Sequence, residues 1–278
     1  MRLKTGFSDS RAALIEFRTS FERVRHLRSN LSPFDQGLLW LIVAWVLAMI
    51  SLPILKWILG ENALPIGISG GVLLQLMTVW AILVWTWGAR RTLITSGVIV
   101  LFAWVVEFVG HTTGFPFGAY AYTDRLQPQF GGVPLLIPLA WLMMLPPAWA
   151  VARRIARGGI AFVLISAVAF TAWDLFLDPQ MVGWNLWTWA QPVGYFGIPW
   201  VNFAGWLIAS AIITALASRL APPRDLPARP LIAIYAITWA LETIGQLFFW
   251  GLPGPALIGG AAMGLMLLWT LKRPSNVA

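Results

Sequence analysis

Long apolar runs separated by short polar turns make up the chain from residue 36 onward. A run of about 20 apolar residues forms a helix long enough to cross the hydrocarbon core of a bilayer. Because lipid cannot satisfy free backbone polar groups, such runs are helical. The pattern predicts an all-α, polytopic integral membrane helix bundle with about eight spans. We place them at 36–58, 67–87, 93–111, 133–151, 159–177, 198–218, 231–249 and 255–271.

Composition supports lipid as the solvent of this chain. Apolar residues make up 59% and charged residues 11%, whereas roughly 25% of the residues in soluble domains are charged. The absence of cysteine excludes disulfides, thiolate metal sites and cysteine nucleophiles. The net charge of +8 does not indicate nucleic acid as a partner, because the basic residues form short clusters between apolar runs.

These basic clusters predict how the spans are oriented. Cytoplasmic loops collect Lys and Arg, and with eight spans all but two of the 19 basic residues fall on one side. The exceptions are Lys56 and Arg125. We therefore expect both termini to be cytoplasmic, in the plasma membrane of a prokaryote. The loop clusters are Arg90 and Arg91, then Arg153, Arg154 and Arg157, then Arg219, Arg224 and Arg229.

The first 35 residues differ from the rest of the chain. They are too polar for a cleaved secretory signal, and apolar residues from Leu14 to Leu27 recur at helical spacing beside several arginines. We expect 1–35 to be a basic interfacial segment on anionic lipid and 36–278 to be the transmembrane catalytic domain. A partly disordered cytoplasmic tail is the alternative for the first segment.

Four acidic residues share one level of the predicted membrane domain. Glu107, Asp174, Asp178 and Glu242 all lie toward the outer ends of outward-running spans. Ionisable side chains inside spans are costly and usually face a bundle interior or a water-filled cavity, so a functional role is expected. The alternative is that each one only caps a helix or hydrogen-bonds a neighbour.

Two outer loops carry most of the unusual sequence. The first runs from Glu107 to Pro134 and the second from Asp174 to Trp206, and both are rich in Gly, Pro and aromatic residues. Irregular backbone at membrane depth must be buried in protein or line a cavity, so we predict re-entrant or lid-like outer loops over a pocket. The Glu242-x-x-Gly245 spacing repeats that of Glu107 and Gly110, through internal duplication or through coincidence.

Aromatic residues crowd beside the acids of the second loop. Many are explained by packing or by an interfacial belt. Their faces also attract cations, so an acid beside an aromatic cage suits protonation of an alkene and shelter of the carbocation. With His111 the only histidine besides His26, a multi-histidine iron site is excluded. The chain shows no nucleotide-binding motif, and Asp174-x-x-x-Asp178 is poorer than a magnesium-diphosphate motif, so we expect neither metal nor cofactor.

The loop motifs are similar to those of a known family. The stretch Glu107–Trp141, with Gly110-His-Thr-Thr-Gly114-Phe-Pro-Phe-Gly118-x-Tyr120-x-Tyr122, and the stretch Asp174–Trp206 resemble the membrane carotenoid biosynthesis family that contains the CruF-type carotenoid 1,2-hydratases and bisanhydrobacterioruberin hydratase. The resemblance covers roughly residues 36 to 271. It implies a cofactor-independent hydro-lyase that adds water to the terminal isopropylidene double bond of an acyclic carotenoid such as lycopene, γ-carotene or a bacterioruberin precursor.

The resemblance also implies a polyene substrate in the bilayer and leaves open contact with other carotenoid biosynthesis enzymes. Hydration needs a proton donor, a stabilised tertiary cation and a water held by a base. We expect Asp174 to donate the proton and Asp178 or Glu107 to hold the water. His111 is expected to position that water or to tune the Glu107 carboxylate, and a purely structural His111 is the alternative. The residues expected to bind substrate or water are Trp173, Tyr120, Tyr122, Trp184, Trp187, Trp189, Tyr195, Asn202, Trp206, Glu242 and Gln246.

Three other functions fit parts of the pattern. A proton- or ion-coupled transporter would use buried carboxylates, although it predicts acids spread across the membrane depth. A cyclase or prenyl-transferring elongase acting on isoprenoid lipids would use the same acid and aromatic cage. A non-catalytic scaffold for pigment enzymes would tolerate the loss of every carboxylate.

Overall fold

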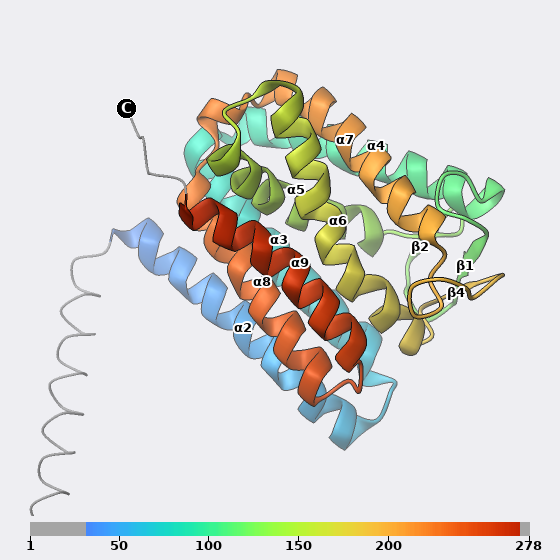
Figure 1. Ribbon diagram of the computed structural model, residues 1–278. Coiled ribbons are helices and arrows are strands. Elements are labelled where there is room, and N and C mark those ends of the chain that lie inside the picture. The colour runs from blue at the N-terminus through green and yellow to red at the C-terminus, as the bar shows by residue number, and fades with distance from the viewer. Residues whose placement is uncertain (1–31, 273–278) are drawn as a thin grey trace, which may run out of the picture.

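The computed structural model describes residues 32–272, and most of the predicted interfacial segment 1–35 lies outside them. In this part, eight helices are long and apolar enough to cross a membrane, which confirms the predicted spans (Figure 1). They are α2 (Pro33–Leu59), α3 (Ala63–Trp87), α4 (Ala89–Thr113), α5 (Leu136–Ile155), α6 (Gly159–Gly183), α7 (Trp200–Leu220), α8 (Ala228–Phe248) and α9 (Pro253–Lys272).

Helix α5 forms the centre of the bundle. Nearly all of its side chains are buried, and α3, α4, α6 and α8 pack around it. Helix α2, by contrast, packs mainly on α3 and buries only Trp45 and Leu52. Any functional side chain on the inner faces of these helices is therefore enclosed by α5 and its neighbours.

Helix α6 continues past the predicted end at residue 177 to Gly183. The predicted span ends one residue before Asp178-Pro179. Pro179 has no N–H for the Leu175 carbonyl one turn earlier. The Tyr195 hydroxyl donates to that carbonyl instead, at 3.1 Å. This side-chain contact lets the helix continue through the proline and keeps Asp178 in a regular turn.

The two aromatic loops are joined by backbone pairing at one end of the bundle. Strand β1 (Tyr120–Tyr122) pairs antiparallel with β4 (Trp187–Trp189), with Tyr120 opposite Trp189 and Tyr122 opposite Trp187. Strands β2 (Gln129–Phe130) and β3 (Val133–Pro134) form a short hairpin before α5. Alternation along a strand places Tyr120 and Tyr122 on one face, with Trp187 and Trp189 opposite them.

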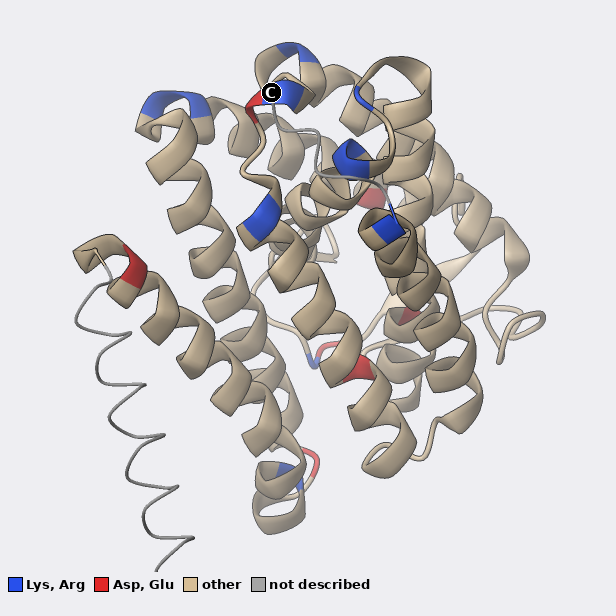
Figure 2. Cartoon of the chain, turned by 60° about the vertical axis from the view of Figure 1, so that its left-hand side comes forward, with Lys and Arg blue, Asp and Glu red and all other residues tan. Residues whose placement is uncertain are grey.

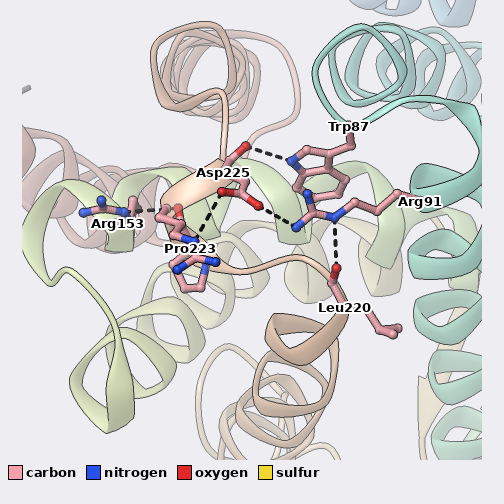
Figure 3. A network of polar contacts seen from close by, with 7 residues as sticks. Trp87, Arg91, Arg153, Leu220, Pro223 and Asp225 are labelled. Carbon is pink, nitrogen blue, oxygen red and sulfur yellow. Dashed lines mark hydrogen bonds and ion pairs between the residues drawn. The ribbon is translucent and has the colours of Figure 1, made fainter.

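The opposite end carries most of the basic residues of the described part (Figure 2). Here the short 3-10 helix η1 (Pro223–Asp225) is held by side chains from α3, α4 and α5 (Figure 3). Arg91 bonds the Asp225 carboxylate and the Leu220 carbonyl, both at 2.9 Å. Trp87 donates to the Asp225 carbonyl, and Arg153 donates to the Pro223 carbonyl. Arg91 and Arg153, which belong to the basic clusters that indicate topology, therefore also bind η1 to the bundle.

Substituting Asp225→Ala should loosen this end of the bundle. The half-buried Arg91 would lose its carboxylate partner, and we expect unfolding in detergent to become easier by about 1 kcal/mol. A thermal unfolding midpoint measures the change. Arg224→Gln is the matched control, because Arg224 is largely exposed and its ion pair with Asp225 is long, at 3.6 Å. Equal midpoints for Asp225→Ala and Arg224→Gln would contradict this role of Asp225.

Candidate active site

A cavity runs from the paired loops into the bundle. Its walls come from α2, α3, α4, α5, α6, α7, α8 and both strands β1 and β4, and they are mostly aromatic and aliphatic. A large apolar pocket with few convergent polar groups is the usual form of a small-molecule site. Besides Tyr120 and Tyr122, the polar residues in its wall are Gln75, Glu107, Asp178, Gln180, Asn202, Thr238 and Glu242.

Glu107 is held by three donors. The Tyr120 and Tyr122 hydroxyls donate to Oε2 at 2.7 and 2.8 Å, and the Trp141 indole donates to Oε1 at 3.1 Å. Only 3% of Glu107 is exposed. The carboxylate thus acts as acceptor for every partner and is fixed in one orientation at the cavity wall.

Gly110 makes this arrangement possible. It lies one helical turn after Glu107, and a Cβ placed on it would come within 2.6 Å of the Phe117 ring and 3.1 Å of the Tyr120 hydroxyl. A larger residue would push the first loop away from α4. The Glu-x-x-Gly spacing therefore has a steric reason at Glu107.

The two tyrosines remain hydrogen-bond donors over a wide pH range. Burial raises the pKa of Tyr120 and of Tyr122 well above the ordinary value, and the nearby Glu107 charge raises both pKa values further. Their phenolate forms are therefore disfavoured at any pH where the protein is handled. Titration of these tyrosines should not limit activity on the alkaline side.

A pair of buried aspartates on α6 forms the second acidic site. Asp174 and Asp178 are four residues apart on one face of the helix, so their carboxyl groups are neighbours. The Asn202 amide from α7 donates to Asp174 at 3.1 Å and also to Asp178, while the Trp187 indole donates to Asp178 at 2.9 Å. The Asn202 amide thus holds the two carboxyl groups together.

We call Glu107, Asp174 and Asp178 the acidic cluster. Within residues 32–272, no basic side chain forms an ion pair with it, and the four ion pairs all lie elsewhere. The two carboxyl sites are near enough for the Glu107 charge to act on Asp178. The described residues also contain no group of three or more His, Cys, Asp or Glu suited to hold a metal ion. The cluster is thus an acidic site without a basic partner in an apolar cavity.

Most of the expected aromatic residues surround this cluster. Trp206 stacks on Trp141 with ring centroids 4.7 Å apart, and Trp173 meets Trp206 edge to face. The aromatic residues from both loops in the cavity wall are Phe117, Tyr120, Tyr122, Trp184, Trp187, Trp189 and Trp206. Asp178 and Asn202 also lie in the wall, whereas Asp174 lies behind Asp178, with its Oδ1 buried and lacking a hydrogen-bond partner.

Besides Asp174, three expected site residues lie outside the cavity wall. The His111 ring packs against Gly132 and lies 6.0 Å from the Tyr122 ring, so it lies behind the tyrosines. Tyr195 donates to the Leu175 carbonyl, and Gln246 donates to the Phe176 carbonyl and to Gln180. These residues position wall elements. Glu242, the acid one turn before Gln246, does line the cavity.

Sequence reasoning missed several wall residues. Trp141 is fully buried and donates to Glu107, yet it marks only the end of the first motif. Gln75 donates to Thr238 at 3.2 Å across α3 and α8. An amide in the middle of an apolar span is the signal that could have revealed Gln75, because polar groups inside a membrane are costly.

Comparison with known proteins gives one family. A family model described as carotenoid biosynthesis protein matches residues 67–266. The bisanhydrobacterioruberin hydratase of Haloarcula japonica is 28% identical over 132 residues, which are 46% of this chain and 45% of that protein. The match thus spans about half the length of this curated relative. No solved structure matches the chain.

Proposed function

Because the chain belongs to the carotenoid biosynthesis protein family, we propose that it is a carotenoid hydratase that adds water to the terminal isopropylidene double bond of an acyclic carotenoid. One observation carries the proposal. A large apolar cavity in a membrane-spanning bundle ends at two hydrogen-bonded carboxyl sites among aromatic rings. The name of the Haloarcula japonica relative supports the same reaction class.

The proton comes from the aspartate pair. Asp178 faces the cavity and Asp174 lies behind it, so we assign the donor role to Asp178 and a proton-sharing role to Asp174. The proposed donor, Asp178, thus lies one helical turn after Asp174, the donor expected from the sequence. The proton adds to the less substituted alkene carbon and leaves a tertiary cation on the other carbon.

The aromatic wall and Glu107 complete the reaction. The faces of Trp173, Trp184 and Trp206 stabilise the cation, at about 0.5 to 2 kcal/mol each. A water that donates a hydrogen bond to Glu107 attacks the cation with its oxygen atom. The same water transfers a proton to the Glu107 carboxylate. The product is a tertiary alcohol, and return of the proton to the aspartate pair restores the site without a cofactor.

Expression in a lycopene-producing host tests the proposal. We expect extracted pigments to gain the mass of one water per hydrated end, with isotope-labelled oxygen in the new hydroxyl and one carbon-bound deuterium when the medium is deuterated water. Cyclisation would leave the mass unchanged, and elongation would add a prenyl unit. A host whose pigments stay unchanged, although the protein is folded in its membranes, contradicts hydration of this substrate.

The proposal also includes a topology. We propose that the acidic cluster faces the non-cytoplasmic side of the plasma membrane, with both termini in the cytoplasm and the basic segment 1–35 on the inner lipid surface. Tags at either terminus should then be accessible only from the cytoplasmic side in intact cells.

A further inference from the structure

Helix α2 forms the outermost part of the cavity wall. Helix α2 lies at the outside of the bundle (Figure 1), and its two buried side chains, Trp45 and Leu52, both line the cavity. Many of its other large apolar side chains are exposed, including Leu47, Ile50 and Ile54. One face of α2 therefore closes the cavity, and the opposite face meets lipid.

Side chains of α3 and α8 meet behind α2. Gln75 and Thr238 join α3 and α8 near the midpoint of both helices. Toward the acidic end, the cavity is lined by Gly71 of α3 and by Leu241 of α8, and the α2 side chains cover the space between these helices. Helix α2 has little or no backbone contact with α8.

The contact between α2 and α3 is close. Met49 and Leu52 fit where Gly71 and Gly67 lack side chains, since a Cβ on either glycine would come within 2.6 Å of these side chains. Smooth glycine surfaces let helices approach closely inside membranes. Pro53 lies within α2 and cannot donate to the Met49 carbonyl, so the helix is weakened beside the cavity.

Charged residues fasten the end of α2 to the loops. Glu61 pairs with Lys56 at 3.6 Å and with Arg125 at 3.7 Å. Lys56 lies 5.8 Å from the Trp250 ring centroid, and Arg125 donates to the Trp184 carbonyl at 3.0 Å. The Trp184 and Trp250 rings meet edge to face at 4.8 Å. We call Lys56, Glu61 and Arg125 the latch.

The latch accounts for an exception in the charge pattern. Lys56 and Arg125 are the two basic residues on the predicted outer side, and both pair with the same acid. Their pairing connects α2 with the loop that leaves β1 and with the α8–α9 turn. Neither residue touches the acidic cluster, so hydration chemistry does not explain them.

We propose that α2 is a lateral gate, through which a bilayer-dissolved polyene reaches the cavity between α2 and α8, and that the latch holds this gate closed. A long polyene stays in the hydrocarbon layer, so a lipid-facing opening spares it passage through water. The inference rests on the proposed function only in taking the ligand to be a polyene. Opening requires α2 to tilt on its glycine contact with α3 while the latch breaks.

Thiol labelling tests the gate independently of turnover, because the chain has no cysteine. Leu241→Cys places a single thiol in the cavity wall on α8. In liposomes, we expect an apolar maleimide dissolved in the bilayer to label it slowly, and Glu61→Gln to raise the labelling rate about fivefold by removing both ion pairs of the latch. Lys56→Gln removes one pair and should give a smaller increase.

Arg224→Gln is the matched control, because it removes an exposed ion pair at the other end of the bundle. It should leave the labelling rate unchanged. The gate is overturned if Glu61→Gln has no effect or slows labelling, if a charged water-soluble maleimide labels as fast as the apolar one, or if no reagent reaches the thiol from lipid. Latch-dependent labelling without any hydrated pigment would instead support the gate and count against the proposed function.

Discussion

Substitution Asp178→Asn should nearly abolish hydration. The asparagine amide has the same shape but no acidic proton, so the alkene cannot be protonated from the cavity wall. Loss of a positioned general acid costs about 10²- to 10⁴-fold in rate. The measurement is the amount of hydrated pigment per unit of folded protein in a lycopene-producing host, with folding checked by gel filtration in detergent.

Asp174→Asn is the matched comparison, because it makes the same chemical change one helical turn away, behind the wall. We expect a smaller loss, since Asp178 keeps its Trp187 and Asn202 contacts. If Asp174→Asn were the inactive variant and Asp178→Asn the active one, the donor would be Asp174. Wild-type rates in both would remove the aspartate pair from the mechanism.

The bundle could be predicted because the bilayer imposes a length and a polarity on each span. The eight predicted runs correspond to helices, and the errors lie at the ends. At Pro179 the helix continues beyond the predicted end of the span for a nonlocal reason. The free Leu175 carbonyl finds the Tyr195 hydroxyl, which comes from a loop twenty residues later. Local propensity carries no information about such a contact.

The sequence predicted that the acidic residues lie at one depth in the membrane, but it did not predict their contacts. Glu107 and Asp178 do share one cavity wall, but their partners depend on pairing between β1 and β4, which joins residues more than sixty positions apart. Asp174 and Asp178 share one face of α6, so the level of the cavity along the helix decides which of them lines it, and spacing alone cannot fix that level. His111 follows Glu107 by one turn, yet it packs on Gly132 behind the tyrosines.

Substitution Glu107→Gln should reduce hydration by about 10²- to 10⁴-fold, because no carboxylate would remain to take the proton from the attacking water. The glutamine amide would also direct N–H groups at Tyr120 or Tyr122, whose hydroxyls donate to Glu107 in the native site. Pigment analysis under the conditions used for Asp178→Asn measures the loss.

Tyr122→Phe separates the two effects of this change. It removes one of the three donors to Glu107 but leaves the carboxylate, so we expect a loss of only about tenfold, the value of one hydrogen bond to a charged group. If Tyr122→Phe matched Glu107→Gln, the carboxylate would matter only as an anchor for the first loop. If Glu107→Gln hydrated lycopene at the wild-type rate, the water would have to be activated elsewhere in the cavity, and Glu242 would be the wall carboxyl group besides the proton donor Asp178 that could do so.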